Sequence, residues 1–389
     1  MTGDMTNGAS GLGSPADQPS RRVVGVLVAV AGVGALAFLL GIVGGAGRRA
    51  WAIFLVNLLF WSGLAVTGPA VAGMIEVTEG RWGGRLRRIA ATTAAFLPVS
   101  FVLFLVLFAG LPALYPWVTT PIPKKAAWLN VPFFVVRIVV EVAALYWVSI
   151  RFAKAVHDSP AGPAEEPGRA RRARLAVVLL LLYGVVVSLL GYDLVMTLDP
   201  TWFSGLLGGY VLVTSLYSGF AFLVLLVGIK SFGRPSWVMP PREVQDLAKL
   251  VFATSILWMY FFWSQYLVIW YGNVPVETRY VLGRFFEDPY RGLAWTSFFI
   301  GWLIPFAYLL ARLTGRPPES HRLLVGVSCL SLLAIFLERI VLVFPSVTPS
   351  IGLGSVVVSI FVTAGFAALF ILSYLLFVPR FGLASRVDA

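Results

Sequence analysis

The sequence has very few of the side chains that hold redox metals. Its 389 residues include one cysteine, Cys329, and two histidines, His157 and His321. A c-type haem needs a Cys-x-x-Cys-His motif, an iron-sulfur cluster needs several cysteines, and a b-type haem in a helical bundle needs histidines inside the membrane. We therefore interpret Cys329 as a small buried hydrophobic residue and place both histidines in loops or at helix ends. We expect no metal site, no redox cofactor held by ligands of this chain and no catalytic residue, because nucleophile-base sets and P-loops are missing as well.

Charged residues are also scarce. They make up 12% of the chain, whereas 59% of its residues are hydrophobic. A soluble protein of this length would lack the polar surface to cover itself, but a bilayer supplies an apolar solvent. The apolar runs are continuous rather than alternating, which favours helices over a β-barrel. The net charge of +12 does not indicate nucleic-acid binding, because the basic residues lie in short gaps between apolar runs, where they set topology. The sequence thus predicts an all-α polytopic membrane protein.

The apolar runs predict about ten transmembrane helices, each close to the length that crosses a ~30 Å hydrocarbon layer. Their expected ranges are 23–46, 51–75, 90–111, 132–152, 175–198, 204–230, 247–272, 292–311, 322–344 and 352–377. The helix at 247–272 should end at Gly272, because the sequence Gly-Asn-x-Pro follows as a helix stop. Residues 1–20, rich in Gly, Ser and Pro, are expected to form a disordered tail, and residues 381–389 a second tail.

Lysine and arginine residues are distributed unevenly between the two ends of the predicted helices. Most of the 30 lie at the end that carries both termini and the loops at 76–89, 153–174, 231–246 and 314–321. The opposite end holds Arg48, Arg49, Lys124, Lys125, Arg279, Arg284 and Arg291. The positive-inside rule then places both termini in the cytoplasm. The two longer loops of the outer end, 112–131 and 273–291, are expected to be ordered interfacial segments.

Two stretches of the chain resemble each other. Residues 174–200 and 322–345 each begin at an arginine, carry an acid late in the helix and end at or near a proline. If this reflects a repeat, helices two to five (51–198) and six to nine (204–344) form two parallel four-helix bundles, with the first and tenth helices flanking them. Such an arrangement differs from the inverted repeats of many secondary transporters. Chance similarity among apolar helices is the alternative.

Seven polar residues lie inside the predicted helices, where burial is costly and usually serves a purpose. They are Asn57, Arg137, Glu141, Asp193, Gln265, Glu338 and Arg339. All of them fall in the outer half of the membrane in this topology. Arg137 and Glu141 are one turn apart and can pair within their helix. Glu338 and Arg339 are adjacent and point about 100° apart, so each is expected to need a partner on another helix.

These residues allow two interpretations. In the first, Glu141, Asp193 and Glu338 are candidates for proton conduction, and Arg137 and Arg339 are their structural counter-ions. In the second, all of them are buried ion pairs that fix helix register. The inner half offers only hydroxyl groups, so a continuous carboxylate relay is not encoded in this chain alone.

Aromatic residues recur at helical spacing between 247 and 272. They are Trp258, Phe261, Phe262, Trp263, Tyr266 and Trp270. One hypothesis is a groove for a flat apolar headgroup such as a quinone, with Asn57, Gln265, Trp263 and Tyr266 as candidate lining residues. The alternative is packing against neighbouring helices together with an interfacial aromatic belt.

Four stretches carry a resemblance to a known family. They are QYLVIWYGNVPVET at 265–278, KAAWLNVPFFVVR at 125–137, YDLVMTLDPTWFS at 192–204 and NLLFWSG at 57–63. Across residues 50–380 the chain resembles the F subunit of alternative complex III, a quinol:electron-acceptor oxidoreductase of bacterial membranes. That subunit belongs to the NrfD-like, polysulfide-reductase-type superfamily, whose fold is two four-helix bundles with flanking helices. The resemblance implies a NrfD-like transmembrane domain at 21–380 in the bacterial inner membrane.

The resemblance also implies partners. They are a sister NrfD-like C subunit, multi-haem cytochrome c and iron-sulfur subunits, and often a terminal oxidase, in a respiratory or photosynthetic electron transport chain. The C subunit is the better-supported site of quinol oxidation, so this chain is expected to be an accessory subunit that supports assembly, proton translocation or binding of quinone (menaquinone or ubiquinone) or lipid. The alternative hypothesis is a stand-alone solute or ion transporter, which helices broken at mid-membrane would indicate.

Overall fold

The computed structural model describes residues 20–80, 83–158, 168–232, 239–311, 321–348 and 352–380, which form helices and loops without a strand. Nine helical segments of this part of the chain are long and apolar enough to cross a membrane. The predicted fold class, an all-α polytopic membrane protein, is confirmed.

The helices of the first half are α1 (Arg21–Gly41), α2 (Gly47–Val77), α3 (Gly84–Ala91), α4 (Leu97–Leu107), α5 (Leu111–Leu114), α6 (Pro116–Thr119), α7 (Val131–His157) and α8 (Arg169–Leu190). Those of the second half are α9 (Leu207–Lys230), α10 (Pro241–Gly272), α11 (Pro275–Phe285), α12 (Arg291–Phe298), α13 (Ile304–Leu310), α14 (His321–Val347) and α15 (Leu353–Arg380). Short π or 3-10 turns extend or join several of them: η2 (Ile42–Ala46), η3 (Thr92–Phe96), η4 (Phe108–Gly110), η5 (Pro123–Lys125), η6 (Gly191–Val195), η7 (Met196–Leu198) and η8 (Phe299–Leu303).

The first of the nine segments, Arg21–Val77, contains a reversal of the chain. Gly45 has a φ of 80°, a left-handed conformation that favours glycine. The Phe38 ring then lies 4.9 Å from the Trp51 ring and 5.2 Å from the Phe54 ring. In one continuous helix, residues sixteen positions apart would be separated by about 24 Å. α1 and α2 are therefore two helices packed side by side at this end.

α2 is the central helix of the molecule. Nearly all of its side chains between Ala50 and Ala72 are buried, because it contacts α4, α7 and α8 of the first half as well as α9 and α14 of the second. α9 in turn contacts α10 and α14, and α14 contacts α12 and α13. α2 thus contacts helices from both halves of the chain, and α8 also contacts α9. The two parallel four-helix bundles and their superposition as a repeat stay a prediction.

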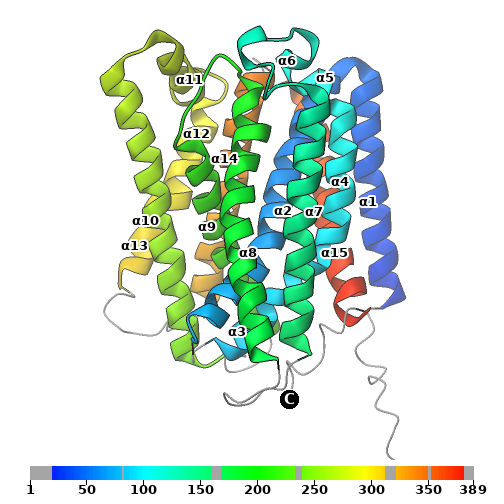
Figure 1. The fold of residues 1–389 in the computed structure, drawn as a ribbon, viewed down its shortest axis with the longest axis vertical. Coiled ribbons are helices and arrows are strands. Elements are labelled where there is room, and N and C mark those ends of the chain that lie inside the picture. The colour runs from blue at the N-terminus through cyan, green and yellow to red at the C-terminus, as the bar shows by residue number, and fades with distance from the viewer. Residues whose placement is uncertain are drawn as a thin grey trace, which may run out of the picture.

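The two ends of the helical layer differ (Figure 1). The upper end carries α5, α6 and α11, whereas the lower end carries α3, the start of α1 and the end of α15. The predicted tails at 1–20 and 381–389 lie outside the described residues, except for Ser20. Within the upper loop at 273–291, residues 275–285 form helix α11, which turns the side chain of Arg284 inward, where it is buried. That inward turn positions the site described next.

Candidate functional site: a cavity between α9, α10, α11 and α14

The sharp turn between α10 and α11 creates the site. α10 ends at Gly272, and Asn273 follows in the left-handed conformation with a φ of 45°. The Asn273 backbone N–H donates to the Ile269 carbonyl at 3.0 Å, and Pro275 then starts α11. The predicted helix stop is confirmed. As a result, α11 lies against α10, α12 and α14 at the upper end of the bundle.

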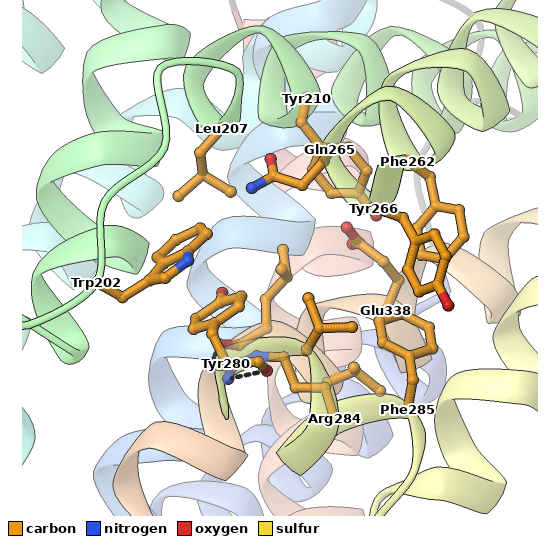
Figure 2. Close-up of a pocket in the computed structure, with 13 residues that line it drawn as sticks. Trp202, Leu207, Tyr210, Phe262, Gln265, Tyr266, Tyr280, Arg284, Phe285 and Glu338 are labelled. Atoms are coloured by element: carbon orange, nitrogen blue, oxygen red, sulfur yellow. Dashed lines mark hydrogen bonds between the residues drawn. The ribbon is translucent and has the colours of Figure 1, made fainter. Parts of the chain in front are cut away.

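A cavity of about 70 Å³ lies between these helices. By the same measure a buried water needs roughly 10–15 Å³, so the cavity has room for several waters or one small ring. A second cavity of about 20 Å³ shares part of the lining. The main cavity is lined by Trp202, by Leu207 and Tyr210 of α9, by Phe262, Gln265 and Tyr266 of α10, by Tyr280, Val281, Arg284 and Phe285 of α11, and by Glu338, Val341 and Leu342 of α14. Figure 2 shows Trp202 and Tyr280 on one side of this space and Phe262, Tyr266 and Phe285 on the other.

One wall of the cavity is a stack of three planar groups. The Trp202 and Tyr280 rings are parallel to within 3° at 3.6 Å, and Arg284 Cζ lies 3.3 Å from the centre of the Tyr280 ring. Arg284 is buried and donates to the Tyr280 carbonyl at 3.1 Å, the Leu342 carbonyl at 3.3 Å and Ser346 Oγ at 2.6 Å. These acceptors hold the guanidinium in place, and among the described residues it has no ion pair with a carboxylate.

The hydroxyl of Tyr280 is buried and makes no hydrogen bond with the described residues. Burial raises the pKa of Tyr280, an effect that the Arg284 charge partly offsets. Burial also lowers the pKa of Arg284, although guanidinium groups stay protonated in proteins. The wall therefore presents one unused hydroxyl donor and a positive charge held behind a ring.

Glu338 supplies the acid of the cavity. It is buried on α14, and Figure 2 shows its carboxylate pointing into the space. Arg339 Nη1 lies 3.3 Å from Glu338 Oε2, and Arg339 Nη2 donates to Thr214 Oγ1 on α9 at 2.7 Å. The two residues thus pair with each other despite being adjacent, and Arg339 also has the expected partner on another helix. Within the described residues neither Glu338 oxygen accepts a hydrogen bond of good geometry.

The remaining polar lining comes from α9 and α10. Tyr210 lines the cavity beside Glu338, and its hydroxyl accepts a hydrogen bond from Trp258 Nε1 at 3.0 Å. Gln265 also lines the cavity, and its Oε1 accepts from Ser204 Oγ at 2.9 Å. Buried polar groups are normally satisfied by protein or water, so the unused groups around this space indicate a site built for a polar guest.

Only part of the predicted aromatic groove on α10 faces this cavity. Tyr266 and Phe262 line it, in agreement with the hypothesis. Trp263 does not: its side chain is 51% exposed and stacks loosely on Tyr266 at 5.8 Å on the outer face. Trp270 is 65% exposed as well. These two residues follow the alternative interpretation, an aromatic surface that faces lipid.

Asp193 and Arg137 form a separate buried cluster in the first half of the chain. Arg137 Nε donates to Asp193 Oδ2 at 2.8 Å and Nη2 donates to Oδ1 at 2.7 Å, a two-pronged ion pair. Trp128 Nε1 donates to the same Oδ1 at 3.0 Å, and its ring covers the guanidinium at 3.9 Å. Of the two acids considered as partners of Arg137, the folded chain thus pairs it with Asp193 on the neighbouring segment and not with Glu141 of its own helix.

The other predicted polar residues lie away from the cavity. Glu141 is partly buried on α7, and its Oε2 has no hydrogen-bond partner among the described residues. Asn57 is fully buried on α2, where it donates to the Ile53 carbonyl and to Thr363 Oγ1 and accepts from Trp61 Nε1. Asn57 therefore ties α2 to α15 and does not line the candidate ligand site.

The cysteine and histidine predictions had mixed outcomes. Cys329 is exposed on α14, so its assignment as a buried residue is wrong. The run of α14 is apolar on every side, which hides from sequence inspection which face meets lipid. His157 does lie at the end of α7, as predicted, and is buried there. The described residues contain no group of three or more His, Cys, Asp or Glu that could hold a metal ion.

Sequence reasoning missed four residues that shape the cavity: Trp202, Tyr210, Tyr280 and Arg284. Arg284 was counted only as a charge of the outer end. The available signal was the spacing of Tyr280 and Arg284, which are four residues apart behind a proline that can start a helix. That spacing puts an aromatic ring and a cation on one helical face, which is unusual for a simple interfacial loop.

No model of a known protein family and no curated protein matches this chain. The chemistry of the cavity therefore has to be inferred from its lining. Flat apolar walls favour a ring, and the unused carboxylate and hydroxyl favour hydrogen-bonding substituents on that ring.

Proposed function

We propose that this integral membrane protein binds the ring headgroup of a quinone-type amphiphile in the cavity between α9, α10, α11 and α14. The observation that supports the proposal is the combination of flat aromatic walls with the inward-pointing carboxylate of Glu338 in one space between candidate membrane-spanning helices. A ring between the Tyr280 wall and Phe262 would make stacking contacts, each worth about 0.5–1.5 kcal/mol beyond the burial of area. An apolar tail would remain in the hydrocarbon region.

We further propose that the chain is the F-type, NrfD-like subunit of an alternative complex III. The proposal rests on the resemblance at 125–137, 192–204 and 265–278, and the cavity agrees with it because residues of the last two stretches contribute to the lining. With one cysteine and two histidines, the chain has no ligand set for a haem or an iron-sulfur cluster. Electrons would therefore pass through the partner subunits, the C subunit and the cytochrome and iron-sulfur subunits.

The three carboxylates are proposed to have different roles. Glu338 faces the cavity, and its ion pair with Arg339 at 3.3 Å leaves carboxylate lone pairs for a ligand, so it is the group best placed to exchange a proton with a ring hydroxyl. Asp193 accepts three hydrogen bonds from Arg137 and Trp128, which makes it a structural anion. Glu141 stays a candidate for proton conduction, because its Oε2 has no hydrogen-bond partner among the described residues. It does not line either of the two cavities.

A matched pair of variants tests ligand binding. Leu207 lines the cavity and its neighbour Leu206 is 37% exposed, so Leu207→Phe should fill the space and Leu206→Phe should not. Titration with menadiol, a naphthoquinol without a long tail, should show binding to the wild type and to Leu206→Phe, and at least about tenfold weaker binding to Leu207→Phe, equivalent to ~1.4 kcal/mol. Equal affinity of all three proteins would contradict the site.

Purification in mild detergent tests the assembly. A stable particle with haem-bearing partners supports the complex. A monodisperse, haem-free particle that transports a solute in vesicles supports the transporter hypothesis instead. The transporter hypothesis would be supported by a helix that is broken at mid-membrane. α12 and α13 instead continue as one helical segment through the π-turn η8 at Phe299–Leu303.

A further inference from the structure

We infer that the Arg137–Asp193 ion pair positions the wall of the cavity, so that it controls ligand binding from a cluster that does not line the cavity. The inference rests on the proposed function, because it concerns the same site. It assigns Arg137 and Asp193 the role of positioning residues. The ion pair and the cavity are linked by residues 199–206, here called the connector, which join η7 to α9.

The ion pair fixes the chain just before the connector. Asp193 is completely buried, and Arg137 and Trp128 hold both of its oxygens. The turn that contains Asp193 is a π-helix, and it passes into the 3-10 turn η7. Thr197 Oγ1 donates to the Asp193 carbonyl at 2.5 Å, and Tyr115 donates to the Leu194 carbonyl at 3.1 Å. The segment is thus irregular and is held by side chains.

The connector is tied down by two hydrogen bonds to its backbone. Lys125 Nζ donates to the Pro200 carbonyl at 2.7 Å, and the Tyr192 hydroxyl donates to the Gly205 carbonyl at 2.6 Å. Lys125 belongs to the same upper loop as Trp128, and Tyr192 is next to Asp193. Both restraints therefore come from residues that are close in the sequence to Trp128 or Asp193.

The connector then builds the cavity. Trp202 is fully buried and stacks on Tyr280 at 3.6 Å. Ser204 donates to Gln265 Oε1 at 2.9 Å, and Leu207 begins α9 at the cavity edge. Within the connector the Trp202 N–H donates to the Asp199 carbonyl at 3.1 Å, in a single turn. Residues 199–206 are not part of a helix, so their position depends on side-chain restraints such as those from Lys125 and Tyr192. A shift of Asp193 is therefore transmitted to Trp202 rather than absorbed.

The experiment separates positioning from folding. Loss of one partner would strand a buried charge, so the main variant is the double substitution Arg137→Met with Asp193→Asn, which removes both charges and keeps each side chain close to its original size. Trp128→Phe is the milder variant, because it removes one donor to Asp193 and keeps a ring over the guanidinium. Glu76→Gln is the matched control. Glu76 is a buried carboxylate at the lower end, bound by Arg87 and Arg172.

Two measurements are made on the full chain in its native assembly. The first is the Kd for menadiol. The second is the rate at which a small methanethiosulfonate reagent labels Val281→Cys in a Cys329→Ser background, since Val281 lines the cavity and Cys329 is the chain's own thiol. The labelling rate reports the closure of the cavity wall and needs no ligand.

The double variant should bind menadiol about tenfold more weakly, which corresponds to ~1.4 kcal/mol. In the double variant the reagent should label the cysteine of Val281→Cys several-fold faster, because a displaced connector uncovers that position. Trp128→Phe should change both quantities in the same direction by a smaller factor, and it decides the question if the double variant does not fold. Glu76→Gln should leave both at wild-type values. A folded double variant with wild-type affinity and wild-type labelling overturns the inference. If wild-type protein does not bind menadiol, the proposed function fails, and the labelling rates alone still decide whether the ion pair positions the wall.

Discussion

The carboxylate of Glu338 should distinguish a quinol from a quinone, and Glu338→Gln tests this directly. An ionised carboxylate only accepts hydrogen bonds. Menadiol presents two hydroxyl donors, whereas menadione presents two carbonyl acceptors. The wild-type cavity should therefore favour menadiol, because Arg339 Nη1, 3.3 Å from Glu338 Oε2, favours the ionised form of this buried carboxylate and leaves it lone pairs to accept from a hydroxyl.

The size of the effect follows from the kind of bond that is lost. A hydrogen bond to a charged group contributes about 1.5–3 kcal/mol, and each ~1.4 kcal/mol is tenfold in Kd. Glu338→Gln should thus raise the Kd for menadiol by about tenfold to a hundredfold. The glutamine amide can donate to a carbonyl, so the Kd for menadione should stay the same or fall. Arg339 keeps its hydrogen bond to Thr214 at 2.7 Å, which limits the damage to the fold.

Anaerobic calorimetric titration of both compounds into wild-type and variant protein measures these constants, and the thermal midpoint of each sample controls for unfolding. The opposite response of the two compounds is the signature, because general damage would weaken both. A variant that keeps its thermal midpoint and changes neither Kd by more than about twofold, a difference of ~0.4 kcal/mol, would refute the role of Glu338 as the acceptor.

Three further predictions follow from the same structure. Gly34→Leu should loosen α1 from α15, since a side chain at Gly34 would collide with the backbone of Gly365. The thermal midpoint should fall and the menadiol Kd should not change. An unchanged midpoint would show that this contact is not tight. Trp263→Leu should leave the menadiol Kd unchanged, because Trp263 is 51% exposed and does not line the cavity; a clear rise in Kd would bring it back into the site. Arg137→Ala and Asp193→Ala should each cost about 3–5 kcal/mol of stability and the double variant much less than their sum, and additive losses in a double-mutant cycle would deny that the two residues act as a pair.

Much of the fold is legible in the sequence because the bilayer imposes simple rules. Long apolar runs predict the membrane-spanning helices. The Gly-Asn-x-Pro sequence predicts the end of α10 at Gly272, which the left-handed Asn273 follows. The polar residues Glu338 and Gln265 were identifiable as functional candidates for the same reason, since polar groups in a membrane are expensive. Both line the cavity.

Which buried charged side chains pair could not be predicted from the sequence, because pairing depends on distances between segments that are far apart in the chain. The sequence allowed either Asp193 or Glu141 as the partner of Arg137, and only the folded structure shows that the partner is Asp193. The sequence also did not show which side of α10 faces the cavity and which side lies on the surface. Aromatic residues cover several sides of that helix, so Tyr266 in the cavity and Trp263 on the surface have the same sequence signature. α11 was missed because a short helix behind a proline resembles an interfacial loop.

Occupation of the cavity between α9, α10, α11 and α14 by a ring headgroup can be measured by photolabelling with an azido derivative of menadione, followed by mapping of the labelled peptides. A ring bound in the cavity should place labels within residues 202–210, 258–266 and 280–285, and excess menadiol should abolish them. Labels confined to the exposed surface around Trp270, or labels that excess menadiol does not displace, would contradict it.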